Sequence, residues 1–311
     1  MKNIFIGLVV IILIGLGIYF FVGRTSNTLN VVNPEETQKN DTPVVETPTE
    51  QVDESTTTDE EQTMKAETIL GTSVEERPIM AYHFGTGDTE LLFIGGIHGG
   101  YEWNTSLLAF EFIDYLKKNP SIVPSNVRVT VVPVLNPDGL YKVTGTTERF
   151  TKADVSSSNE TVVAGRFNTN NVDLNRNFDC DWQTQGVWQN KTVSGGSSAF
   201  SEPETKAIRD YVNSHKITAS VTWYSAAGGV FASNCHNDIL PETLDLTNAF
   251  AKASGYKAFE NFDFYAITGD MVNWFAKNNI PAISVLLTSH DDIEWSKNIA
   301  GIEAILNQYA E

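Results

Sequence analysis

The pattern of hydrophobic and polar positions divides the chain into three parts, and the first is a long apolar run. Residues 3–23 form 21 positions without a charged side chain, rich in Ile, Leu, Val and Phe. About 20 such residues cross the hydrocarbon layer of a membrane, so the run predicts a single-pass N-terminal anchor. A long signal peptide is the alternative. The run exceeds a signal core of about 7 to 15 residues, and no small-residue cleavage site follows it.

The second part, residues 24–66, is dominated by Thr, Pro, Glu and Asp and contains no aromatic residue. Such a segment buries too little apolar surface to offset the entropy of the chain, and we expect a disordered linker. The linker holds the folded part away from the bilayer. Together with the weak charge asymmetry around the anchor, it favours an extracytoplasmic position for the rest of the chain.

The third part, residues 67–311, alternates short apolar runs with amphipathic stretches. Alternation of this kind predicts an α/β domain with a sheet that is covered on both faces. One expected helix opens with a capping box formed by Ser201 and Glu204. The expected strands are 89–97, 127–135, 217–224 and 282–287, and the expected helices are 105–118, 201–215, 242–254, 270–279 and 293–310.

The net charge and the cysteine spacing argue against two kinds of function, nucleic-acid binding and a cysteine-based metal site. The formal net charge is −18, which argues against nucleic acid as a partner. The two cysteines, Cys180 and Cys235, are far apart and do not have a metal-type spacing. Outside the cytoplasm they can form a disulfide, and two buried free thiols are an equally good interpretation.

A candidate metal site lies in GGIHGGYEWNT, residues 95–105. His98 leaves an apolar strand, passes two glycines and is followed by Glu102 at the start of a helix. Glycines allow a sharp backbone turn, and the imidazole and carboxylate can then reach one ion from the same side.

Candidate anion-binding residues lie further along the chain. NVDLNRNFD, residues 171–179, contains Asn175 and Arg176, and an Arg fork beside an amide can hold a carboxylate. Arg166 is placed to stabilise an oxyanion beside a metal. FYAITGDMVNW, residues 264–274, places Tyr265 on a glycine-containing loop.

These residues together resemble the zinc carboxypeptidase family of carboxypeptidase A type, over about 240 residues from GTSVEERPIMAYHFG (71–85), which is similar to the family's first strand, to the last helix. The resemblance implies a mixed, mostly eight-stranded sheet sandwiched by helices, and hydrolysis of the C-terminal residue of a peptide. It further implies one zinc ion with His98 and Glu102 as ligands and Arg166 as the oxyanion-stabilising residue. By the same resemblance, Asn175 and Arg176 bind the terminal carboxylate of the substrate, and Tyr265 closes over it.

Three positions differ from the family pattern. The usual His-x-x-Glu is here His98-x-x-x-Glu102. The family's third zinc ligand, a His, is replaced by Tyr224, and its general base, a Glu after an Ile-Pro-Ala step, is replaced by Leu286. A catalytic zinc site normally has three protein ligands, and loss of a general base alone lowers rates by roughly 10² to 10⁴.

Three hypotheses follow. In the first, catalysis is impaired or lost, zinc is weakly bound or absent, and the domain binds peptide C-termini or cell-wall stem peptides. In the second, the enzyme is active with a rearranged site. In the third, the domain is an envelope scaffold with a vestigial site. The second hypothesis uses Tyr224 or His236 as a ligand and His290, Asp291, Asp292 or Glu294 as the base.

Val272 and Asn273, near Tyr265, favour an apolar or neutral residue at the C-terminus of the substrate.

Overall fold

The computed structural model describes residues 65–236 and 238–310 of the chain. The predicted anchor at 3–23 and nearly all of the predicted linker lie outside these residues. Within the described part, no helix is both long enough and apolar enough to span a membrane. Membrane anchoring therefore stays a prediction.

In the described residues, eight strands form one mixed sheet, as the sequence analysis expected. The four central strands, β4, β3, β7 and β10, are parallel to one another, and antiparallel or shorter strands complete both edges. The strand order is β1 (Glu67–Thr72), β2 (Pro78–Phe84), β4 (Val127–Val132), β3 (Thr89–Ile94), β7 (Ile217–Ser225), β10 (Ala282–Leu287), β8 (Gly229–Ala232) and β9 (Lys257–Phe259).

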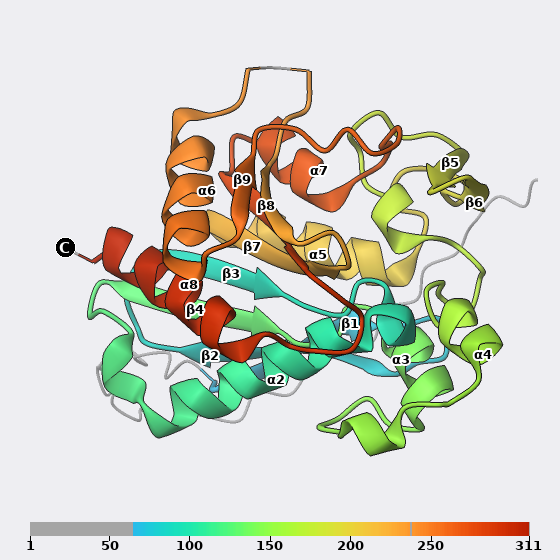
Figure 1. Ribbon diagram of the computed structural model, residues 1–311, viewed down its shortest axis with the longest axis horizontal. Coiled ribbons are helices and arrows are strands. Elements are labelled where there is room, and N and C mark those ends of the chain that lie inside the picture. The colour runs from blue at the N-terminus through green and yellow to red at the C-terminus, as the bar shows by residue number, and fades with distance from the viewer. Residues whose placement is uncertain (1–64, 237, 311) are drawn as a thin grey trace, which may run out of the picture. The chain divides into compact units, whose positions relative to one another are not determined.

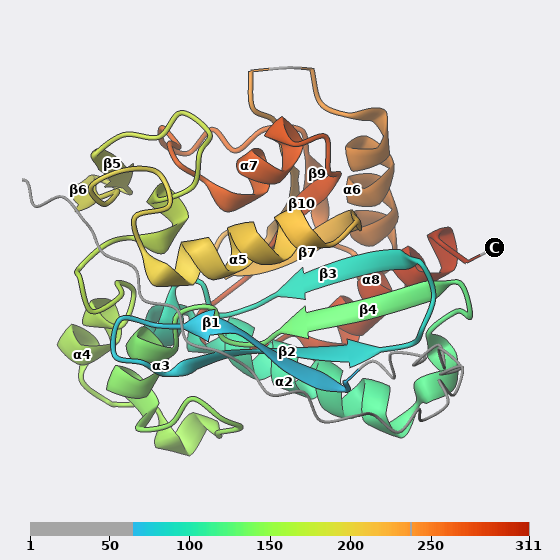
Figure 2. The same ribbon diagram turned by 180° about the vertical axis from the view of Figure 1, so that it is seen from behind.

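Helices cover both faces of the sheet, which explains why its central strands are apolar throughout. In β3, Leu91 and Phe93 belong to one buried cluster, and Leu92 and Ile94 belong to the other. Alternate residues of a strand point to opposite faces, so both faces of β3 are buried. Figure 1 shows α2 (Trp103–Lys118), α6 (Pro241–Ser254) and α8 (Trp295–Gln308) on the near face. Figure 2 shows α5 (Pro203–Ser214) and α7 (Met271–Lys277) on the opposite face.

Several short elements were not predicted from the sequence. They are too short or too polar for a clear hydrophobic period. Figure 1 shows α3, α4 and the β5–β6 hairpin gathered beyond one end of the central strands. These elements are α3 (Pro137–Thr144), α4 (Asn159–Ala164), β5 (Gln185–Trp188), β6 (Lys191–Ser194), η1 (Gly99–Glu102), η2 (Pro120–Ile122), η3 (Lys152–Asp154) and η4 (Leu174–Arg176).

Two local predictions are wrong. The segment 71–85 is not one strand, because it contains the end of β1, a turn and β2. The capping box of Ser201 and Glu204 does not form. The first helical residue is Pro203, and the N-cap Glu202 makes no side-chain capping bond. Ser201 instead donates to the Glu202 carboxylate and to no backbone group of the helix.

Glu204 is buried instead of capping the helix, and this has a consequence for stability. Its carboxylate accepts hydrogen bonds from Val74 N at 3.3 Å and Asn168 Nδ2 at 3.2 Å. Burial raises the pKa of Glu204 from 4.5 to about 7. Folding therefore takes up a proton between these two pH values.

We expect the free energy of unfolding to fall as pH rises from 4.5 to 7, by about 3 kcal/mol from this residue alone. Glu204→Gln should remove most of that slope, because the side chain can no longer ionise. Urea unfolding of both proteins at pH 5 and pH 8 measures it. The same pH dependence in the variant and in the original protein contradicts this assignment.

Candidate active site

The eight positions that the family resemblance assigned to the site line one cavity of about 630 Å³. The neighbouring parallel strands β3, β7 and β10 end beside this cavity. The carboxyl ends of parallel strands lie at the same edge of a sheet, which brings residues far apart in the chain together. The eight residues are His98, Glu102, Arg166, Asn175, Arg176, Tyr224, Tyr265 and Leu286.

His98 and Glu102 face each other at the end of β3. His98 Nδ1 lies 2.9 Å from Glu102 Oε1, and both side chains are nearly fully buried. Neither ring nitrogen of His98 has a partner in hydrogen-bonding geometry. The imidazole and the carboxylate therefore lie close together at the cavity without a hydrogen bond between them. The loop allows this because Gly99 has φ +45°, and a Cβ there would lie 2.6 Å from Gly165 O.

Asp173 links the histidine to Arg166, and the sequence analysis did not single it out. Arg166 Nε and Nη2 donate to Asp173 Oδ2 at 3.0 and 2.8 Å, and Asp173 Oδ1 lies 3.4 Å from His98 Nε2. Burial alone would raise the pKa of Asp173, but the Arg166 guanidinium holds it well below its usual value. An ionised Asp173 therefore orients both partners, as carboxylates behind metal-binding histidines do.

Arg166 itself is held beside the candidate metal position. Its Nη1 lies 3.7 Å from Glu102 Oε1, and its guanidinium stacks 4.4 Å from the centre of the Trp188 ring. Trp188 belongs to the β5–β6 hairpin, so this unpredicted element forms one wall of the cavity. The side chain of Arg166 is only 2 % exposed, and its charge acts where water is largely excluded.

Arg176 is fixed by backbone carbonyl groups and keeps part of its fork free. Nε and Nη2 donate to Val187 O, and Nη1 donates to Asn175 O. A guanidinium has five N–H donors, so one N–H remains on each terminal nitrogen. These two donors belong to a side chain that lines the cavity, and charge-assisted hydrogen bonds from a guanidinium to a carboxylate are strong.

Hydrogen bonds also fix the side-chain amide of Asn175. Its Oδ1 accepts from Met271 N at 3.0 Å and from the Tyr224 hydroxyl at 3.3 Å, and its Nδ2 donates to Asp270 Oδ2 at 2.7 Å. One N–H of the amide remains without a partner among these contacts. Arg176 and Asn175 thus present three fixed donors. Tyr265 is adjacent, with its ring centre 5.9 Å from the Arg176 guanidinium carbon.

The two replaced positions lie side by side. Tyr224 in β7 is the register partner of Leu286 in the parallel strand β10, and both side chains are buried at the cavity. Burial raises the pKa of Tyr224 well above 10, so its phenol is neutral. It is directed toward Asn175 by its hydrogen bond and gives no anionic ligand. Leu286 makes the adjoining wall apolar.

These contacts fit a zinc ion only in part. His98 and Glu102 are the two residues that would hold it, and the unpartnered imidazole nitrogens agree with that role. Over residues 65–236 and 238–310, no cluster of three or more His, Cys, Asp or Glu side chains is arranged to hold a metal ion. A third protein ligand, which catalytic zinc sites normally have, is not supplied by this set.

Of the alternative bases considered from the sequence, only His290 lines the cavity. Asn104 Nδ2 donates to two backbone carbonyls, so its Oδ1 accepts the Ser225 hydroxyl proton at 3.1 Å. His290 Nδ1 must then donate to Ser225 Oγ at 2.7 Å, which leaves His290 Nε2 unprotonated. Burial lowers the pKa of His290 and favours this neutral form.

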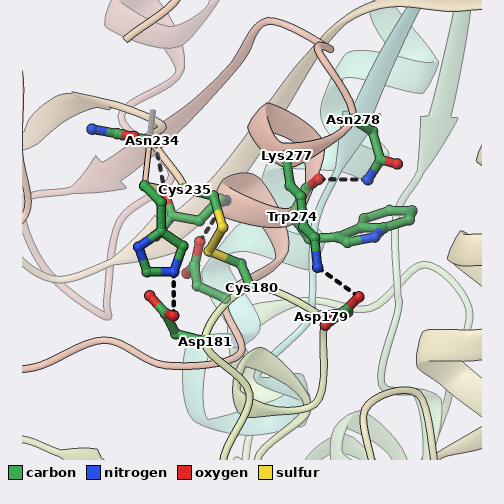
Figure 3. Close-up of a disulfide and its surroundings, with 11 residues drawn as sticks. Asp179, Cys180, Asp181, Asn234, Cys235, Trp274, Lys277 and Asn278 are labelled. Carbon is green, nitrogen blue, oxygen red and sulfur yellow. Dashed lines mark hydrogen bonds and ion pairs between the residues drawn. A yellow bond between two sulfur atoms is a disulfide. The ribbon is translucent and has the colours of Figure 1, made fainter. Parts of the chain in front are cut away.

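The cysteines form a disulfide, which resolves the two alternatives left by the sequence. Figure 3 shows Cys180 bonded to Cys235, with Asp181 and Asn234 beside them. Cys180 O also accepts from Gly269 N at 2.7 Å, and Asn234 N donates to Asn273 Oδ1 at 3.0 Å. The disulfide therefore joins two cavity walls, the segment after Arg176 and the segment after β8, and the two hydrogen bonds tie both segments to the start of α7.

A family model described as zinc carboxypeptidase matches residues 50–292 of the chain, in agreement with the resemblance in the sequence. Carboxypeptidase O of Bos taurus is 32 % identical over 171 residues, which cover 50 % of this chain and 44 % of that protein. Gamma-D-glutamyl-L-diamino acid endopeptidase 1 of Lysinibacillus sphaericus is 25 % identical over 231 residues, which cover 68 % of this chain and 57 % of that protein. The chain spans about half the length of these two relatives.

Solved structures show the same fold. Bovine thrombin-activatable fibrinolysis inhibitor, in complex with tick carboxypeptidase inhibitor, aligns with a TM-score of 0.61 at 18 % identity, covering 78 % of this chain and 89 % of that one. Murein-tripeptide amidase of Escherichia coli O157 aligns with a TM-score of 0.54 at 18 % identity, covering 80 % and 94 %. At this identity the likeness concerns the fold alone.

Proposed function

Because the chain belongs to the zinc carboxypeptidase family, we propose that it is a membrane-anchored, extracytoplasmic domain that binds peptides through a free C-terminal carboxylate and has impaired or lost hydrolysis. The observation that carries the proposal is the fixed donor group of Arg176 and Asn175 in the cavity. Preorganised donors bind a carboxylate without a further loss of side-chain entropy. Nothing in this donor group depends on a metal ion.

Impaired hydrolysis is supported by the pair of Tyr224 and Leu286. A neutral phenol that is hydrogen-bonded to Asn175 does not complete a zinc site, and a Leu side chain cannot accept a proton from water. Both replacements affect the same chemical step. A bound zinc ion would supply Lewis acidity there, and His98 and Glu102 alone would hold it weakly.

Cell-wall stem peptides are the ligand class that we favour. The names of two relatives refer to such chemistry, one cleaving at a diamino acid and one acting on a murein tripeptide. An extracytoplasmic position on a linker would bring the domain to the cell wall. The long acidic linker argues for the same location.

The second candidate function is an active peptidase with a rearranged site, and one observation favours it. His290 presents an unprotonated nitrogen at the cavity, where a general base is required. Zinc content separates the two candidates. About one equivalent of zinc retained through dialysis of the purified protein favours the active enzyme, and little or none favours the binding domain.

We expect the full-length protein to bind a peptide acid more tightly than the same peptide with an amidated C-terminus. Arg176→Ala should weaken binding of the acid about 10- to 100-fold, because charge-assisted hydrogen bonds to the carboxylate are lost. Calorimetry in the presence of a chelator measures binding without hydrolysis. Arg149→Ala is a matched control, since within the described residues Arg149 pairs with Glu111 and Asp114 and lies outside the cavity. Equal affinities for acid and amide contradict the proposal.

A further inference from the structure

A second cavity, of about 360 Å³, shares no lining residue with the candidate active site. It lies between the last turn of α5 and the strands β1, β2 and β4, on the face of the sheet that α5 covers (Figure 2). Arg128, which lines it, is the second residue of β4, and its register partner Glu90 is the second residue of β3. The cavity is therefore found where the central parallel strands begin, whereas the candidate active site is found where they end.

The guanidinium of Arg128 lacks a hydrogen-bond acceptor. Its side chain is 21 % exposed, and its Nε is buried without a partner. Among residues 65–236 and 238–310, the carboxylate nearest to it is that of Glu90, whose Oε2 lies 4.0 Å from Nη1, too far for a hydrogen bond. A guanidinium has five N–H donors, and a buried donor without an acceptor is destabilising. A ligand in the cavity can supply the missing acceptor.

Glu90 compensates part of the charge of Arg128 and does not fill this role. Its Oε1 accepts hydrogen bonds from Thr130 Oγ1 at 2.6 Å and from the Tyr211 hydroxyl. These two bonds hold the carboxylate in place, and its other oxygen stays out of hydrogen-bonding distance of the guanidinium. The donors of Arg128 are therefore available to a group that enters the cavity.

The rest of the wall suits an anion that carries an apolar part. Lys65 adds a second cation, and the carboxylate of Asp210 is paired with Arg209 at 2.7 Å. Ile69, which is 62 % exposed, and Leu70 contribute apolar surface. A cation without acceptors beside apolar side chains is the arrangement that binds a small organic anion.

His83 lines the same cavity, and its hydrogen bonds allow it to gain a proton. The Thr130 hydroxyl donates to Glu90, so Thr130 Oγ1 accepts from His83 Nδ1 at 3.0 Å. His83 Nε2 is then unprotonated in the neutral ring and accepts from Thr68 Oγ1 at 2.8 Å. Burial lowers the pKa of His83, so the ring is neutral near pH 7. In the protonated ring, Nε2 donates to Thr68 Oγ1, and the Thr68 hydroxyl becomes free to donate to a ligand.

His215, just after α5, is the second histidine of the cavity. Its Nδ1 donates to Tyr211 O at 2.9 Å, so its Nε2 carries no proton in the neutral ring. The charges of Arg128 and His215 oppose the protonation of His83. The charge of Glu90 favours it. An anion bound among these cations reduces their repulsion, so anion binding and proton uptake by the imidazoles stabilise each other.

We propose that this second cavity binds a small organic anion, with a carboxylate or phosphate group on Arg128, and that binding tightens as pH falls because His83 and His215 take up protons. Both anionic groups accept charge-assisted hydrogen bonds from a guanidinium. The site is independent of the carboxylate-binding function proposed above and of any metal ion. Two sources of the anion are a free molecule and the acidic residues 59–61, which come shortly before Lys65 in the sequence.

The test compares benzenesulfonate, whose charge is the same at pH 5.5 and pH 8, with its uncharged analogue methyl phenyl sulfone. Each is titrated calorimetrically into the full-length protein carrying Arg176→Ala, so that the donors of the candidate active site do not contribute. We expect the sulfonate to bind at least about tenfold more tightly than the sulfone at pH 5.5. Arg128→Gln should bring that ratio close to one. Arg149→Gln, outside both cavities, should leave it unchanged.

Nuclear magnetic resonance of the imidazole groups locates the site without a substitution in it. The chain has five histidines. Saturating benzenesulfonate should raise the titration midpoints of His83 and His215 by about half a pH unit each and leave those of His98, His236 and His290 unchanged. By linkage, the affinity for the sulfonate should rise about three- to tenfold from pH 8 to pH 5.5.

Equal binding of the sulfonate and the sulfone overturns the anion site, and so does an Arg128→Gln variant that keeps the preference for the sulfonate. Should that variant fail to fold, unchanged midpoints of His83 and His215 in the presence of the sulfonate overturn the site by themselves. The source of the anion is tested in the full-length protein without added ligand, by substituting Asp59→Asn, Glu60→Gln and Glu61→Gln together. A fall of the two midpoints assigns the anion to these residues, and unchanged midpoints assign it to a free molecule.

Discussion

The double variant Tyr224→His with Leu286→Glu should hydrolyse the C-terminal residue of a peptide, whereas the unmodified protein should not. Tyr224 lies at the end of β7 beside the cavity that holds His98 and Glu102, so an imidazole there adds the third metal ligand. Leu286 is its neighbour on β10, so a carboxylate there can accept a proton from an attacking water. General-base catalysis contributes roughly 10² to 10⁴ in rate.

The single variants should behave differently from each other. Tyr224→His should raise zinc stoichiometry toward one and give little hydrolysis. Leu286→Glu should give neither, because its carboxylate acts only on a water that a bound metal has activated. The rate of the double variant should therefore far exceed the sum of the singles, as for residues that work as one unit.

Zinc analysis after dialysis and release of the terminal amino acid measure these effects. Tyr141→His, at an exposed position outside the cavity, controls for adding a histidine. Unfolding curves must accompany the rates, since burying a Glu in place of Leu286 is destabilising on its own. Ordinary hydrolysis by the unmodified protein, blocked by a chelator, would instead establish the rearranged site.

The parts of the fold that the sequence predicts are those with a clear hydrophobic pattern. Strand 282–287 and the helix near 242–254 have nearly the predicted bounds, because both faces of the strand and one face of the helix are buried. The candidate site was predicted from short motifs and from the family resemblance, and the fold explains why its residues meet. His98, Tyr224 and Leu286 come at or just after the ends of predicted strands, where parallel strands bring side chains together.

What the sequence could not supply depends on contacts between distant segments. Asp270 lies in a predicted helix start, and only the fold shows that its second oxygen meets Asn175, 95 residues away. Asp173 lies inside the quoted motif, yet its role follows from where Arg166 and His98 lie. The predicted capping box does not form because the Glu204 carboxylate instead accepts hydrogen bonds from Asn168 and Val74. Local propensity is overridden when tertiary contacts are available.

Removing the disulfide should have the largest effect on stability. Cys180 and Cys235 are 55 residues apart, and the loop-entropy relation gives about 4 kcal/mol for a cross-link of that span. We expect Cys180→Ser with Cys235→Ser to lower the free energy of unfolding by about that amount. Urea unfolding of both proteins under non-reducing conditions measures the difference.

A reductant distinguishes the cross-link from side-chain packing, because Cys180 and Cys235 are both buried and serine also changes the packing around them. Reduction should shift the urea midpoint of the unmodified protein toward that of the double variant and leave the variant unchanged. The cross-link holds the segment after Arg176 to the one after β8, so the loss should also appear in binding. In the absence of urea, where the reduced protein is still folded, a peptide acid should bind to the reduced protein more weakly than to the oxidised protein. If reduction moves neither the midpoint nor the affinity, the disulfide does not stabilise these walls of the cavity.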